Sequence, residues 1–193
     1  RSPPKPSSAA SDVYKRQRVR NAPQGSTSVD MRLQSADGPG DVAAYVVSTF
    51  GTPEPLFNTA DGLHERDDST TLPANAHTHV SWAFSKPGIY RLTFTATGVG
   101  PHEVTVAVGV NPPEGMRPLS EGHVDITADV AAGTLDLEDQ GEHFDPATTA
   151  LSIPNSTLQE IPPSPAYRFL GRPGDETYLL PQAVLGKHLH GEV

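Results

Sequence analysis

The sequence has no cysteine among its 193 residues, which excludes disulfide bonds and thiolate metal sites from the chain. A metal site would have to be built from histidine, aspartate and glutamate. No apolar run approaches the roughly 20 residues of a membrane-spanning helix, so we expect no membrane insertion within this fragment. The net charge of −9 argues against nucleic acid and anionic membranes as partners.

Catalytic sequence motifs are also missing. The chain contains no Gly-x-Ser-x-Gly nucleophile elbow, no glycine-rich phosphate loop and no His-Glu-x-x-His pair. We therefore predict that the chain is not an enzyme. We expect no bound cofactor, with zinc as the single candidate that the histidine pairs described below leave open.

The first residues differ in origin from the rest of the chain. Residues 7–17 read SSAASDVYKRQ, which back-translates to an adapter used in transposase-based sequencing libraries. We therefore predict that residues 1–17 are a disordered, translated adapter, and that the natural chain starts near Arg18 within a longer reading frame. The alternative is a natural disordered tail rich in proline and serine.

Proline and glycine are frequent, with 20 and 17 residues, and they separate short apolar stretches. This pattern is typical of strands joined by turns, and no stretch has the 3.6-residue period of a helix. In residues 89–97 the apolar residues Tyr90, Leu92 and Phe94 alternate with polar ones. We expect strands over residues 28–34, 41–50, 77–84, 89–97, 102–110, 123–128, 134–137, 150–153, 167–170 and 177–180, and a long loop over 58–75.

The spacing of these strands predicts an all-β fold. Residues 18–110 fit an immunoglobulin-like β-sandwich, with short alternating strands and frequent turns. Residues 111–120 (NPPEGMRPLS) have the composition of a Pro-rich linker. Residues 121–193 are predicted to form a second, truncated β-rich unit.

Two histidines on one predicted strand are the sharpest candidate site. His77 and His79 are two residues apart, so on a strand they share one face, opposite Trp82. Paired imidazoles can approach one metal ion, with Zn²⁺ the expected first-row metal. The alternative is that they cap the strand start and bond the neighbouring loop. Further ligands could come from His64, Glu65, Asp67 or Asp68.

A second pair, His123 and Asp125, also shares one strand face. A carboxylate that orients a histidine is common around metal ions, and an exposed edge pair is the alternative. His188 and His190 repeat the two-residue spacing near the chain end, where a mobile tail is the alternative to a metal site.

The remaining polar and aromatic residues are expected to have structural roles, in the core or at the surface. Trp82 shares its face with Val80 and is expected in the core, although a sugar-stacking role is the alternative. The acidic run over residues 136–139 lacks the spacing of a calcium-binding loop and is expected to be a solvated turn. His102 and His143 lie beside proline or acidic residues and are expected at the surface.

Two groups of motifs resemble an actinobacterial surface-anchored repeat family, the choice-of-anchor M type. The first group is a Leu-Pro turn, two histidines, Trp-x-Phe and Pro-Gly-x-Tyr, here Leu72-Pro73, His77, His79, Trp82, Phe84, Pro87-Gly88 and Tyr90. The second is the His-Val-Asp-Ile unit over residues 123–126 and the later stretches 169–171 and 179–182. Ser81 departs from the asparagine usual in the family, and the order of the two groups is reversed.

The resemblance implies a secreted protein that is tethered to the cell wall or membrane by a segment outside this sequence. Together with the missing catalytic motifs, it predicts a non-catalytic cell-surface repeat module with a structural or ligand-presenting role. Members are often encoded beside a metal ABC transporter, so the implied partners are other surface proteins or such a transporter. The alternatives are an extracellular zinc-binding module serving the transporter and a carbohydrate-binding domain.

Overall fold

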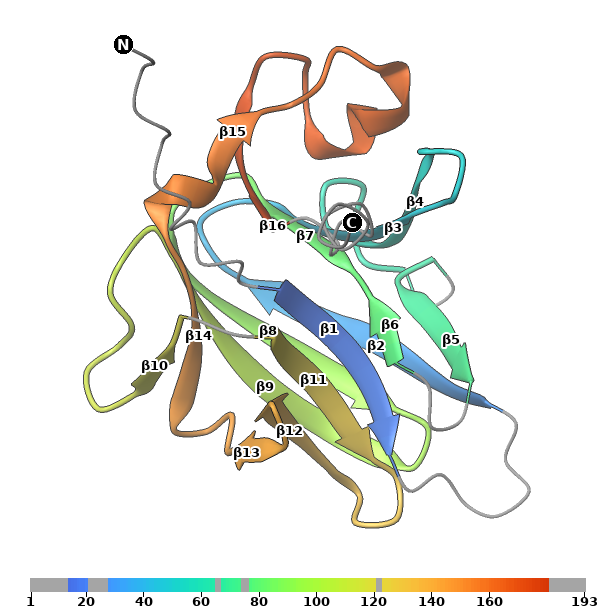
Figure 1. The fold of residues 1–193 in the computed structure, drawn as a ribbon, viewed down its shortest axis with the longest axis vertical. Coiled ribbons are helices and arrows are strands. Elements are labelled where there is room, and N and C mark those ends of the chain that lie inside the picture. Colours follow the sequence, from blue (N-terminus) through green and yellow to red (C-terminus); the bar gives the residue numbers. More distant parts are fainter. Residues whose placement is uncertain (1–13, 21–27, 65–66, 74–76, 121–122, 181–193) are drawn as a thin grey trace, which may run out of the picture.

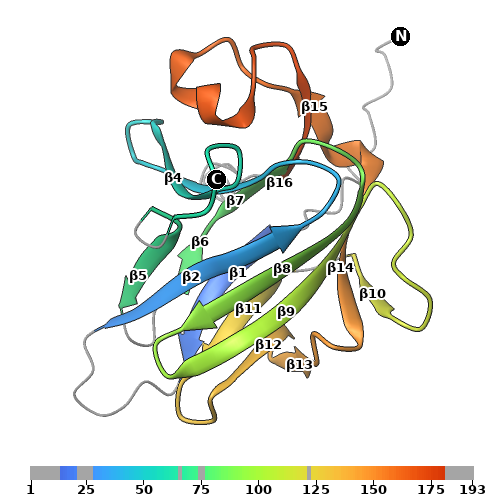
Figure 2. The same cartoon turned by 180° about the vertical axis from the view of Figure 1, so that it is seen from behind.

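A computed structural model gives the structure of residues 14–20, 28–64, 67–73, 77–120 and 123–180. Its regular structure is nearly all β-strand, with two short 3-10 helices, which confirms the predicted all-β sandwich class. No helix in these ranges is long and apolar enough to cross a membrane. The strands form two layers, seen from opposite sides in Figures 1 and 2.

One layer is a six-stranded sheet, and the long strands β8 and β9 lie at its centre. Their pairing is antiparallel, whereas β14 pairs in parallel with β9 and with β10. In spatial order the strands are β10 (Arg117–Leu119), β14 (Thr149–Ile153), β9 (Val99–Val108), β8 (Gly88–Ala96), β2 (Ser28–Asp37) and β5 (Ser69–Pro73).

Two five-stranded sheets make up the other layer. They meet where β6 and β7 follow each other with only Val80 between them. The first sheet has the order β13 (Glu142–Phe144), β12 (Thr134–Asp139), β11 (His123–Asp129), β1 (Tyr14–Arg20) and β6 (His77–His79). The second has the order β15 (Leu158–Glu160), β16 (Glu176–Leu180), β7 (Ser81–Phe84), β3 (Val42–Val47) and β4 (Pro53–Asn58).

Aromatic side chains fill the core between the layers. Trp82 is buried, as predicted, and its ring centroid lies 6.2 Å from that of Phe57 and 6.1 Å from that of Phe94. The alternation on β8 is also confirmed, because Tyr90, Leu92 and Phe94 are buried there. The edge-to-face contact between Trp82 and Phe94 adds to the free energy gained from removing the rings from water.

The Pro-Gly-x-Tyr motif has a packing role. The Tyr90 hydroxyl donates to the Lys86 carbonyl at 2.7 Å, and the Tyr90 ring lies where a Cβ of residue 38 would be. Gly88 has a φ of 141° and approaches Pro39 closely enough to exclude a side chain. The turn over residues 37–40 and the Pro-Gly-x-Tyr strand therefore fit together only with glycine at both positions.

The two predicted units share one core. Strands β14 and β16 come from the range 121–193, yet they pair with β9 and β7 from the range 18–110. Val124, Ile126 and Leu151 belong to the same buried cluster as Phe94. The predicted linker contains β10, which pairs with β14. Residues 111–120 therefore do not separate two cores in this structure.

Three local predictions differ from the structure. The predicted loop over 58–75 contains strand β5, which pairs with β2. The acidic run over 136–139 lies inside β12, where burial of Leu137 holds it in the sheet. Val110, the last residue of the strand predicted over 102–110, follows the end of β9 and is exposed.

Residues 167–170 form part of a 3-10 helix instead of the predicted strand. The helix η2 (Pro165–Leu170) starts where the Ser164 hydroxyl accepts a hydrogen bond from the Ala166 amide at 3.3 Å. Its Phe169 ring packs edge-on against Tyr45, at 5.3 Å between centroids. The other helix, η1 (Asn155–Thr157), is a single turn. Local capping and a proline start thus outweigh the apolar pattern.

Strand β1 begins within the range predicted to be adapter. Residues 14–17 pair with β11 on one side, and residues 16–17 also pair with β6 on the other. This part of the predicted tail is therefore an ordered strand in the structure. Residues 1–13 lie outside the described residues.

Replacing Phe94 with alanine tests the core. Phe94 is fully buried against Phe57 and Trp82, so Phe94→Ala should lower the free energy of unfolding by about 3–5 kcal/mol in urea denaturation. The matched control is Phe50→Ala. Phe50 is 95% exposed, so its loss should change stability by no more than about 0.5 kcal/mol. Equal effects of the two substitutions on the free energy of unfolding would contradict the burial of Phe94 in the core.

Candidate functional site

Strand β1 lies between the two strands that carry the predicted ligand pairs. His79 of β6 and Asp125 of β11 both stand opposite residue 16 of β1, so they occupy one row of the sheet. Two strand spacings separate their backbones by about 10 Å. Asp125 is buried, and His79 is half-buried. The structure thus brings one member of each pair into a common row.

The other members are placed only by their backbone register. His77 stands opposite residue 18 of β1, and His123 opposite residue 14. The side chains of both lie outside the described residues. His188 and His190 are outside them entirely.

The row continues across the sheet with more titratable side chains. Asp125 stands opposite Glu138 of β12, and Glu138 stands opposite His143 of β13. Glu138 is buried and accepts a hydrogen bond of 3.5 Å from the Thr127 hydroxyl. Among the side chains that the structure describes, no three or more histidines and carboxylates are grouped so that they could hold a metal ion.

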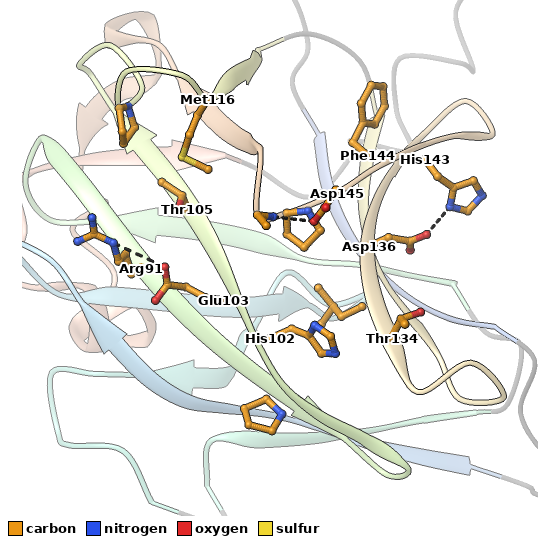
Figure 3. Close-up of a pocket in the computed structure, with 15 residues that line it drawn as sticks. Arg91, His102, Glu103, Thr105, Met116, Thr134, Asp136, His143, Phe144 and Asp145 are labelled. Carbon is orange, nitrogen blue, oxygen red and sulfur yellow. Dashed lines mark hydrogen bonds and ion pairs between the residues drawn. The ribbon is translucent and has the colours of Figure 1, made fainter.

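A second location, which the sequence did not single out, is a groove at a corner of the sandwich. We call it the corner groove. It opens where β9 of one layer diverges from β12 and β13 of the other (Figure 3). Its volume is about 840 Å³. It is lined by Arg91, Pro101, His102, Glu103, Thr105, Pro113, Met116, Thr134, Leu135, Asp136, His143, Phe144 and residues 145–147.

Carboxylates dominate the charge of the corner groove. Glu103, Asp136 and Asp145 line it, whereas Arg91 is its one lysine or arginine among the described residues. Arg91 Nε lies 3.6 Å from Glu103 Oε1, and both side chains are about half exposed. The Asp136 carboxylate pairs with His143 Nδ1. The groove therefore carries three carboxylates against one arginine, with the Arg91–Glu103 ion pair on one wall and the Asp136–His143 hydrogen bond on the other (Figure 3).

Apolar side chains complete the groove. Phe144 projects from β13, and the Arg117 guanidinium carbon lies 4.7 Å from its ring centroid. This cation–π contact orients the ring, and an ion pair between Arg117 and Glu142 at 3.8 Å supports it. Asp145 accepts a hydrogen bond from the Ala147 amide at 2.8 Å, which fixes the turn at the end of the groove.

His102 and His143 were expected at the surface, and both lie at the edge of this groove. His143 is exposed, while His102 is half-buried, with Nε2 3.5 Å from the Gly133 carbonyl. The groove joins residues about 40 positions apart, so no spacing along the chain reveals it. The one local signal is the proximity of His143, Phe144 and Asp145.

Comparison with known proteins assigns neither a family nor a function to the chain. No family model, no curated protein and no solved structure matches the chain. The functional argument therefore depends on the geometry of the chain itself.

Proposed function

We propose that the chain is a non-catalytic binding module of a secreted surface protein, and that its ligand binds in the corner groove. The observation that carries the proposal is the groove itself, with a volume of about 840 Å³ between strands of two layers. This volume lies within the usual range for ligand sites. Strand walls hold side chains more rigidly than loops do, so the site is preformed.

The composition of the groove favours binding over catalysis. His143 is oriented by Asp136, an arrangement that in hydrolases activates a nucleophile. No serine or cysteine lies among the residues that line this groove. The mixture of Phe144 and Met116 with charged side chains is typical of a recognition surface.

The extracellular location and the partners rest on the resemblance of the motifs to surface-anchored repeats. In that setting the module holds other surface proteins or a ligand away from the cell wall. The excess of carboxylates in the corner groove favours a ligand with positive charge.

Filling the corner groove tests this function. Glu103→Trp places a large side chain on the groove wall at an exposed strand position, whereas Glu160→Trp makes the same change on β15, outside the groove. We expect the unmodified chain to bind members of a random peptide library or a glycan array. Binding should fall at least tenfold, or about 1.4 kcal/mol, in Glu103→Trp alone. Equal binding by all three proteins, or no ligand in either collection, would contradict the proposal.

Zinc binding is a second candidate, because the register puts His79 and Asp125 in one row of the sheet. Titration calorimetry with Zn²⁺ on the full chain, which keeps β1 intact, should then show saturable heat. The double substitution His77→Ala/His79→Ala should abolish it, since imidazole nitrogens are the expected ligands. Absence of heat in the unmodified protein, or equal heat in the double variant, would reject the candidate.

A further inference from the structure

Strand β9 has an open edge inside the corner groove. On one side it pairs with β8 along nearly its whole length. On the other side β14 pairs only with residues 105–108. No described strand pairs with that side of residues 102–104. Backbone N–H and C=O groups at such an edge are available for another strand.

The opposite wall of the groove has a similar edge. In β12, residues 137–139 pair with β13, whereas Thr134, Leu135 and Asp136 pair only with β11 on their other side. These three residues line the groove together with Pro101, His102 and Glu103 of β9. Two strand edges therefore border one groove (Figure 3).

Pro101 limits where pairing on β9 can begin. Proline has no N–H to donate, and it commonly blocks the edge of a sheet. Pairing is therefore confined to residues 102–104, an edge of about 10 Å. An extended segment of a few residues matches that length.

The side chains around this edge define what the segment should carry. Glu103 projects from the edge strand and Asp145 lies in the turn after β13, whereas the Asp136 carboxylate is directed to His143 (Figure 3). Pro101, Pro113 and Met116 supply the accessible apolar surface, because Leu135 and Phe144, which also line the groove, are buried. Basic side chains alternating with apolar ones would complement both features, because neighbouring side chains of a strand point to opposite faces.

We infer that an extended, basic segment of a partner protein adds to the edge of β9 as a further strand within the corner groove. The inference rests on the proposed binding function and specifies its ligand. Main-chain hydrogen bonds to residues 102–104 supply affinity, and the carboxylates select lysine and arginine side chains. This is the mode of recognition called β-strand addition.

The probe is a fluorescein-labelled heptapeptide of alternating lysine and valine with capped ends, and binding is measured by fluorescence anisotropy. We expect saturable binding by the full chain. A heptapeptide of alternating glutamate and valine should bind at least tenfold more weakly. Glu103→Lys should lower the affinity for the lysine peptide at least tenfold. Glu160→Lys makes the same change in charge outside the groove and should leave that affinity within twofold of the unmodified chain.

Two further peptides test the backbone pairing directly. Each is N-methylated at every second residue, one on the odd and one on the even positions. Alternate amides of a strand face opposite sides, so one set should abolish binding and the other should leave it nearly unchanged. Equal affinity of both methylated peptides and the parent would overturn strand addition, because no amide would then be used.

The outcomes separate this inference from the proposed function. Glycan binding that Glu103→Trp removes, without binding of the lysine peptide, would retain the binding function and overturn strand addition. Binding of the lysine peptide that Glu103→Trp leaves unchanged would overturn both, because the groove would not be the site.

Discussion

The parallel pairing of β14 with β9 is the contact on which the rest of the structure depends. It joins residues 149–153 to residues 105–108 and thereby holds the later part of the chain against the earlier part. Leu151 and Ile153 enter the common core through it. A parallel pair requires a long crossover, here through β10 to β13, and that crossover builds the second wall of the corner groove.

The position at which this pairing ends also determines where the corner groove lies. Because the pairing of β14 with β9 begins at Ala150 opposite Thr105, residues 102–104 pair only with β8 among the described strands. The turn fixed by Asp145 then carries the chain from β13 to β14 across the end of the groove. The open edge, the carboxylates and Phe144 are thus consequences of one crossover, held in place by a core that Trp82 and Phe94 fill.

The sequence predicted those features that alternation along a single strand determines. The inward face of β8 and the burial of Trp82 were found in this way. Pairing between distant strands leaves no local pattern, so the common core and the corner groove were not predicted. Likewise, residues 167–170 form a 3-10 helix because of the cap at Ser164 and the contact with Tyr45. The row shared by His79 and Asp125 depends on β1, whose residues 14–17 the sequence assigns to an adapter.

Residue-resolved amide hydrogen exchange along β9 of the unliganded chain tests the central claim most directly. Residues 105–108 have strands on both sides, so each of their amides should exchange slowly. In residues 102–104, amides that face the groove should exchange quickly, and those that face β8 slowly. Slow exchange throughout residues 102–108 would show that another segment covers the edge. Rapid exchange in residues 105–108 would show that β14 is not paired there, and either result would contradict the account.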